Sequence, residues 1–338
     1  MAGLEQFSEY FENPLFTEAI NEVPVEAKYI GTRFLPIDTT YDIDFNETVL
    51  TRQADMADIV DRGAELPLTD GDPMRRVSGE ITDIGQSHIV TKKELAALSD
   101  KGSDGKRRIA EKQLLNKAAR IKQNIDARIE WLRWQALGTG MLAYNKSGVI
   151  LGVDFGVPSG NKVTAAIKWG QAGATILADY QKWVLDYVDL NGEAPDVFVT
   201  SLKVIYTVLA DTNVIKAVKG ADNSYGQITL DQLNAYLRGL MLPPMEAFDA
   251  TVTYRDVDNG GVRQTQRLLN EKTGVFLKEG GAIGSQLLGP TVENNMEPGI
   301  FGRTFQLERP YRQIIEVVAA SFPKVMEPEL IKIATVLA

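Results

Sequence analysis

The chain of 338 residues contains no cysteine and only one histidine, His88. The absence of cysteine excludes disulfides, redox-active Cys-x-x-Cys pairs, thiolate nucleophiles, iron–sulfur clusters and cysteine-ligated zinc. One histidine cannot supply a two-histidine metal site, and no spacing ties His88 to a nucleophile. The 45 acidic residues allow many carboxylate pairs for acid/base chemistry, but the sequence points to none of them. It thus singles out no catalytic, cofactor-binding or metal-binding residues, and we predict a protein that is not an enzyme and has no cofactor.

Long apolar runs and an excess of basic charge are missing as well. No stretch of about 18 apolar residues occurs, and the N-terminus lacks the basic and apolar regions of a signal peptide. This predicts a soluble protein that is made inside the cell. The chain has 36 Lys and Arg against 45 Asp and Glu, which gives a net charge of −9. A protein that grips nucleic acid with its whole surface would carry the opposite sign.

Apolar residues make up 44% of the chain, which is enough to form a sizeable core. The length of 338 residues predicts one large domain or two lobes. Residues 1–45 carry short apolar clusters interrupted by three prolines, which predicts an extended arm with one or two short turns. Strands are expected at 46–53 and 75–84, joined by a charged segment rich in Asp, Gly and Pro. This pattern is typical of a long hairpin with little apolar surface to bury.

The strongest periodic signal extends from Asp104 to Leu137. Apolar side chains recur there at steps of three and four residues, which predicts one helix roughly 50 Å long. They are Leu114, Ala118, Ile121, Ile125, Ile129, Leu132 and Ala136. Trp131 and Trp134 fall on the opposite side, so the helix should pack on two faces. The second face is either buried by the same subunit or in contact with a neighbouring one, and both alternatives remain open.

From Trp169 onwards the pattern changes to alternating helices and strands, which is typical of a compact α/β lobe. Helices are expected at 174–190, 202–209 and 230–240, and strands at 196–200, 251–256, 263–269 and 274–278. The chain ends in two β-rich runs, 312–322 and 330–337, the first with the pattern of a strand buried on both faces. Their partners are expected in the first lobe, near residues 149–153.

This order of arm, charged hairpin, long helix, α/β lobe and final strands resembles the lambda-like major capsid protein E family of tailed bacteriophages. The residues that carry the resemblance are GVDFG at 152–156, Trp169 with the helix after it, VFVTS at 197–201, and the ending FPKVMEPELIKIATVLA. The similarity in plan covers nearly the whole chain. It implies an α+β subunit with the Hong Kong 97 capsid fold.

The resemblance also implies how the chain is divided. The parts would be an N-terminal arm, an extended β-hairpin loop that reaches over a neighbouring subunit, a peripheral domain with a long spine helix, and an α/β axial domain. Residues 1–45 would form the arm and the start of the peripheral domain, and residues 46–85 the extended loop. The peripheral domain would continue through 86–169, with its spine helix at 104–137. The axial domain would be 170–303, and 304–338 would return to the peripheral domain.

The implied function is that of a major capsid protein, a viral structural protein whose copies self-assemble into the icosahedral shell of the bacteriophage head. Its partners would be other copies in hexamers and pentamers, with scaffolding, decoration and portal proteins. The shell would enclose DNA without sequence-specific binding, would contact no membrane, and would be assembled in the host cytoplasm and located in the virion. The expected subunit-interface residues are Arg52, Asp58, Asp61, Arg62, Glu65, Arg75, Arg76, Trp131 and Trp134.

Two other classes of protein remain open. A soluble α/β enzyme or ligand-binding protein with a pocket between its lobes would account for the α/β lobe. It would leave the arm and the charged hairpin without a purpose. A ring-forming tail or neck protein would share the features of self-assembly. Electron microscopy would separate shells from rings and from dispersed monomers.

Overall fold

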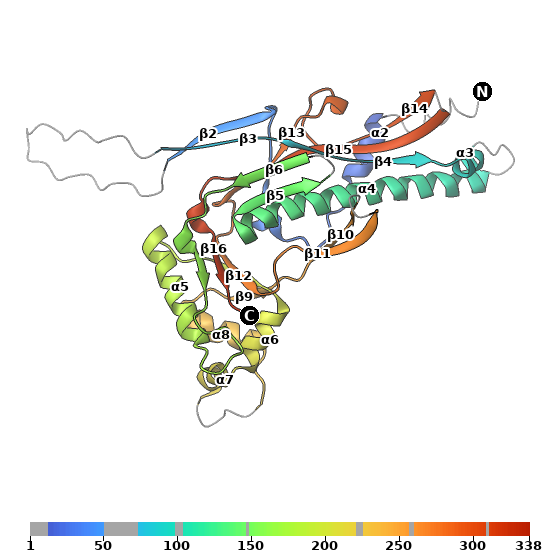
Figure 1. The fold of residues 1–338 in the computed structure, drawn as a ribbon. Helices are drawn as coiled ribbons and strands as arrows, with labels where there is room; N and C mark the ends of the chain where they lie inside the picture. Colours follow the sequence, from blue (N-terminus) through green and yellow to red (C-terminus); the bar gives the residue numbers. More distant parts are fainter. Residues whose placement is uncertain are drawn as a thin grey trace, which may run out of the picture.

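The computed structural model describes residues 13–50, 74–98, 104–146, 149–220, 226–256, 260–308 and 311–338. Figure 1 shows two regions that meet near the end of the long helix α4. One is an elongated region in which α4 runs beneath long strands. The other is a compact lobe that contains the helices α5 to α8. The structure thus has the mixed α and β content that the sequence predicts.

A mixed sheet forms the elongated region. Its central strand is β15, which pairs with β13, β14 and β4, while β1 runs parallel to β13 at the edge. The strands are β1 (Ile37–Thr39), β4 (Thr82–Val90), β13 (Gly284–Gly289), β14 (Phe301–Glu308) and β15 (Tyr311–Val325). Most described side chains of β15 are buried, which confirms the prediction of a buried strand at 312–322.

The long helix α4 (Asp104–Thr139) confirms the helix predicted at 104–137. All seven apolar residues of the predicted stripe are buried. Five of them, from Leu114 to Ile129, form a core cluster with Ile315, Val317 and Ala319 of β15 and with Phe16 and Ile20 of α2 (Asn13–Asn21). The stripe therefore attaches the helix to the central strand of the sheet.

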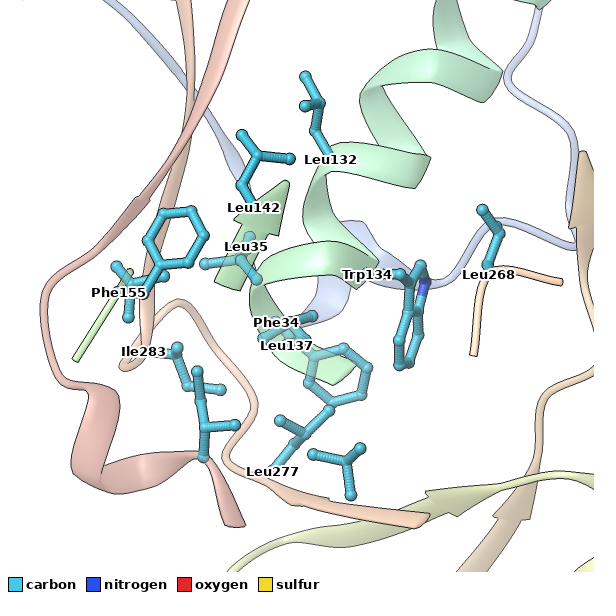
Figure 2. Packing of buried hydrophobic residues seen from close by; sticks show 14 of the residues in the cluster. Phe34, Leu35, Leu132, Trp134, Leu137, Leu142, Phe155, Leu268, Leu277 and Ile283 are labelled. Atoms are coloured by element: carbon cyan, nitrogen blue, oxygen red, sulfur yellow. The ribbon is translucent and has the colours of Figure 1, made fainter. Parts of the chain in front are cut away.

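The opposite side of α4 belongs to the largest core cluster. Trp131, Trp134 and Leu137 lie there with Phe34, Leu35 and Leu277, which come from segments far apart in the sequence. Figure 2 shows the Trp134 indole and the Phe34 ring converging at the end of the helix. Packing on both faces, as predicted, makes α4 the element that joins the two regions of the subunit.

A second sheet lies in the lobe, in the order β7, β16, β12, β8, β9. Its strands are β7 (Lys162–Thr164), β8 (Val197–Thr200), β9 (Met245–Ala247), β12 (Thr273–Leu277) and β16 (Lys332–Thr335), and its helices are α5 (Ile176–Asn191), α6 (Leu202–Ala210), α7 (Thr212–Lys219) and α8 (Leu230–Gly239). Gly274 in β12 has to lack a side chain, because a Cβ there would lie 2.1 Å from the Phe198 ring of the neighbouring strand.

Polar residues at the helix ends explain why the lobe helices begin where they do. The side chains of Ser201, Asp211 and Thr229 accept backbone N–H bonds at the starts of α6, α7 and α8, and Thr229 forms a capping box with Gln232. Helices α5, α6 and α8 and strands β8 and β12 confirm the corresponding predictions. The sequence patterns do not predict α7, β9, β13 or β14.

Two predictions about the ends of the chain are wrong. The C-terminal strands do not pair near residues 149–153: β15 pairs with β4, β13 and β14, β16 pairs with β7 and β12, and β6 (Val149–Asp154) pairs with β5 (Met141–Lys146). An apolar run indicates that a strand is buried, but it carries no information about its partner. Residues 13–45 are more than an extended arm, since α2, the turn Gly31–Arg33 and β1 pack into the subunit.

Two hairpins stand apart from both sheets. One is β2 (Asp44–Leu50) with β3 (Met74–Glu80), and the other is β10 (Thr251–Asp256) with β11 (Val262–Arg267). Neither pairs with any other strand in the part of the chain that the structure describes. The sequence predicts the first as a hairpin and the second as two consecutive strands, at 251–256 and 263–269. The two hairpins are called the β2–β3 ribbon and the β10–β11 ribbon below.

The packing of α4 gives a first test. Ile125 is 1% exposed and lies in the middle of the stripe against β15. Ile125→Asp would bury a carboxylate without a partner and should lower the free energy of unfolding by about 3 kcal/mol or more. We expect an insoluble or unfolded subunit by solubility and circular dichroism. Gln113→Asp on the exposed side of the same helix is the control and should fold. Soluble Ile125→Asp protein with wild-type melting would contradict the packing.

Candidate subunit interface

The base of the β2–β3 ribbon is anchored in the core. Strand β3 continues after one residue into β4, and β4 pairs along nine residues of β15. Phe45 of β2 packs on Phe322 of β15, with ring centroids 5.5 Å apart. Gly79, directly opposite Phe45, leaves room for this ring, because a Cβ there would lie 2.8 Å from it. The ribbon is thus held at its base, and in Figure 1 it projects away from the body of the subunit.

The two tryptophans are buried within the subunit. Trp134 has no exposed surface, stacks on Phe248 at a centroid distance of 4.2 Å, and meets Phe34 edge to face. Trp131 is 7% exposed and packs against Tyr144. Of the two alternatives left open by the sequence, burial by the same subunit holds. The set of expected interface residues therefore loses both tryptophans, because Trp134 has no accessible surface and Trp131 has very little with which to contact a neighbour.

Beside the tryptophans, α4 carries charged residues that are also buried. Glu130 accepts hydrogen bonds from the Gly31 backbone N–H and the Trp134 indole N–H, both at 2.8 Å, and pairs with Arg133. Burial lowers the pKa of Arg133. About two turns before Glu130, Lys122 pairs with Asp126 at 2.7 Å and donates to the Val23 carbonyl at 2.9 Å. These contacts fix the N-terminal segment to the spine helix.

This buried network predicts a large effect for Glu130→Ala. The substitution would leave the Gly31 and Trp134 donors unsatisfied and the Arg133 charge buried without its partner, so we expect the free energy of unfolding to fall by about 3–5 kcal/mol. Thermal or denaturant unfolding measures the loss. Glu130→Gln keeps an acceptor oxygen and should lose less. An unchanged midpoint for Glu130→Ala would show that the network does not hold the segment.

The charged residues expected at the interface fall largely outside the described residues. Arg52, Asp58, Asp61, Arg62 and Glu65 lie there, in the interval between β2 and β3. Arg75 and Arg76 lie in β3, opposite Val49 and Thr48, but their side chains are not described. The prediction that these seven residues contact a neighbour therefore stays a prediction.

The structure reveals exposed features that sequence reasoning missed. At the base of the β2–β3 ribbon, Asp44 lies directly opposite Glu80, and in the β10–β11 ribbon Arg255 lies directly opposite Arg263. All four residues are exposed. Like charges in directly opposed positions destabilise an antiparallel pair. Strand pairing in register is what brings each pair together, so only a correct register prediction could have found them.

Nothing in the described part of the chain forms a chemical centre. No group of three or more His, Asp or Glu side chains there is placed to hold a metal ion. His88 lies in β4, where Lys117 of α4 is 3.0 Å from its Nε2 and also bonds Glu94 of α3 (Lys92–Leu98). None of the helices in the described ranges has the length and apolar content needed to cross a membrane.

The arrangement of sheet, spine helix and lobe matches solved structures of capsid type. A prophage protein of E. coli CFT073 whose name assigns it to the capsid is 14% identical, with 96% of this chain and 99% of that chain covered and a TM-score of 0.63. A phage-related protein of Bordetella bronchiseptica RB50 is 12% identical, with coverages of 95% and 96% and a TM-score of 0.56. The capsid protein of a native GTA particle is 14% identical, with coverages of 93% and 92% and a TM-score of 0.52. The fold is therefore the Hong Kong 97-type capsid fold.

Sequence comparison gives the family. Residues 16–314 match the family described as phage major capsid protein E, and the chain belongs to this family. No curated protein matches it by sequence. The protein is a shell-forming capsid protein of the phage head, which places it in the virion and gives it a structural role. The enzyme, ligand-binding and ring-forming alternatives are not supported.

Proposed function

We propose that the subunits form hexamers and pentamers of a closed icosahedral shell and that residues 46–85 act as a clasp on a neighbouring subunit. The single observation that carries this proposal is the form of the β2–β3 ribbon. It pairs with no other described strand, yet it is continuous with β4 in the main sheet. A two-stranded ribbon is marginally stable by itself in water, so contact with a neighbour would stabilise it.

The composition of the loop supports the same role. Between Thr51 and Pro73 it carries six acidic residues and two arginines and offers both charge signs to a partner. An exposed ion pair stabilises by about 0–1 kcal/mol, but a shell repeats each contact in every subunit. The proposed interface residues are therefore the charged residues of the loop, Arg52, Asp58, Asp61, Arg62, Glu65, Arg75 and Arg76.

The same proposal includes the DNA and the other partners. A net charge of −9 favours a shell that encloses DNA without gripping it, because affinity for phosphates depends on basic contacts. Scaffolding, decoration and portal proteins and assembly in the host cytoplasm are proposed on family membership alone. So is the division into a peripheral domain and an axial domain at 170–303.

The clasp is tested by replacing Ala54 to Pro73 with a short Gly-Ser turn. The subunit should remain folded, because the segment has few apolar residues to contribute to a core. Closed particles should not form, or should dissociate in high salt, where charge pairs are screened. Circular dichroism measures the fold, and electron microscopy with sedimentation measures the particles.

A Gly-Ser segment of the original length is the matched control for the deletion. It keeps the reach of the loop and removes its charges, so it should show the same assembly defect if the charges make the contact. Normal shells from the deletion would show that the loop is not a clasp. An unfolded subunit would show that the loop belongs to the core.

A further inference from the structure

The two ribbons carry like-charged pairs of opposite sign. Arg255 and Arg263 face each other across the β10–β11 ribbon, and Asp44 and Glu80 face each other across the base of the β2–β3 ribbon. None of these four side chains forms an ion pair or hydrogen bond within the described part of the chain. Each pair therefore lowers the stability of its own ribbon, and no ion pair or hydrogen bond of these side chains with the described residues offsets that cost.

The arginine pair lies on a face that is free to meet another molecule. Alternation along the strands places Arg255 and Arg263 on the same face as Thr253 and Thr265, whose hydroxyl groups are 3.2 Å apart. The other face contains Val252, which packs against the main core. All six residues of β11 are exposed. The face with the arginines thus points away from the core and is uncovered.

The two pairs do not meet within one subunit. Figure 1 shows the β10–β11 ribbon on one side of α4 and the β2–β3 ribbon on the other, beyond the main sheet. A contact between them therefore requires two copies of the chain. Because the contact would join two different surfaces, it would be heterologous, which is the type of contact that closes subunits into rings.

We propose that, in the shell, the Arg255–Arg263 pair of one subunit binds the Asp44–Glu80 pair of the next. This inference rests on the shell-forming role of the protein. It goes beyond the clasp of residues 46–85, because it assigns a contact to the base of the ribbon, at Asp44 and Glu80, and names the surface of the next subunit that the base meets. Two guanidinium groups opposite two carboxylates form charge-assisted hydrogen bonds, and the contact removes the like-charge repulsion from both ribbons at once. The assembled state thus gains stability that the free subunit lacks.

Packaged DNA is the competing occupant of the arginine face, since guanidinium and hydroxyl groups also bind phosphates. DNA would satisfy only the basic pair and would leave Asp44 and Glu80 uncompensated. A second copy satisfies both pairs, so the charges favour the second copy.

The test exchanges the charges between the two ribbons. Arg255→Glu with Arg263→Glu, and Asp44→Arg with Glu80→Arg, each keep a like-charged pair in the altered ribbon, so the stability of the free subunit is matched to wild type. Each double variant should fold by circular dichroism and yield at least about tenfold fewer particles, because every copy in the lattice repeats the repulsion. The fourfold variant restores opposite charges between neighbours and should restore particle yield in sedimentation and electron microscopy.

Lys216→Glu with Lys272→Glu is the control for the Arg255→Glu, Arg263→Glu variant, because it lowers the net charge by the same amount at exposed positions outside both ribbons. It should assemble normally. Normal assembly of either double variant, failure of the fourfold variant, or an equal loss in the control would overturn the proposal. Normal particles that retain less DNA would assign the arginines to phosphate. The clasp is judged separately, because replacing Ala54 to Pro73 leaves all four charged residues in place.

Discussion

The subunit depends on one helix that has to bury two faces at once. The stripe from Leu114 to Ile129 packs on β15, and the side with Trp131 and Trp134 packs into the main core. One sheet can bury only one side of a helix, so the second apolar side needs another packing partner. The helix therefore requires the sheet on one side and, on the other, a core that includes Leu277 of the lobe sheet. The relative position of the two regions follows from this requirement.

Apolar burial alone would leave the N-terminal segment poorly specified, because any apolar side chain can cover an apolar surface. Glu130 instead accepts hydrogen bonds from Gly31 and Trp134, and Lys122 reaches the Val23 carbonyl. Separating a buried charge from its partner is costly, so these contacts favour the chain path that keeps Gly31 and Val23 against the helix. Gly31 itself lies so close that a Cβ would be 2.8 Å from the Glu130 carboxylate. The buried charges thus select one path for the chain, beyond whatever stability they add.

The sequence predicts those features of the fold that depend on local periodicity. Local patterns predict the α4 stripe, the lobe helices α5, α6 and α8, and the strands of the two hairpins. Each of these is determined by residues close together in the chain. The partners of β15 and β16 are not, since a buried strand is apolar whatever its neighbour and the pairing of β15 with β4 joins residues more than 200 positions apart, such as Gln313 and Val90. The sequence places Trp134 on a second packing face of the helix but leaves open what covers that face, because a helical wheel gives the direction of a side chain and not its neighbours. The like-charged pairs depend on the register of each hairpin, which the predicted strand bounds do not specify to the residue.

The free subunit of a shell protein has to be stably folded and still has to present surfaces that are stabilised by contact with neighbouring subunits. Both ribbons follow this principle, because each is attached at its base, by Phe45 on Phe322 or by Val252 on the main core, and neither pairs with another described strand. The fold proper is stabilised by buried apolar side chains, which do not depend on neighbours. The ribbons keep unpaired main-chain edges and opposed like charges exposed, and these are interactions that improve when a second copy arrives. Folding and assembly then draw on different residues, so the subunit can be stable in solution and still gain free energy from every contact in the lattice.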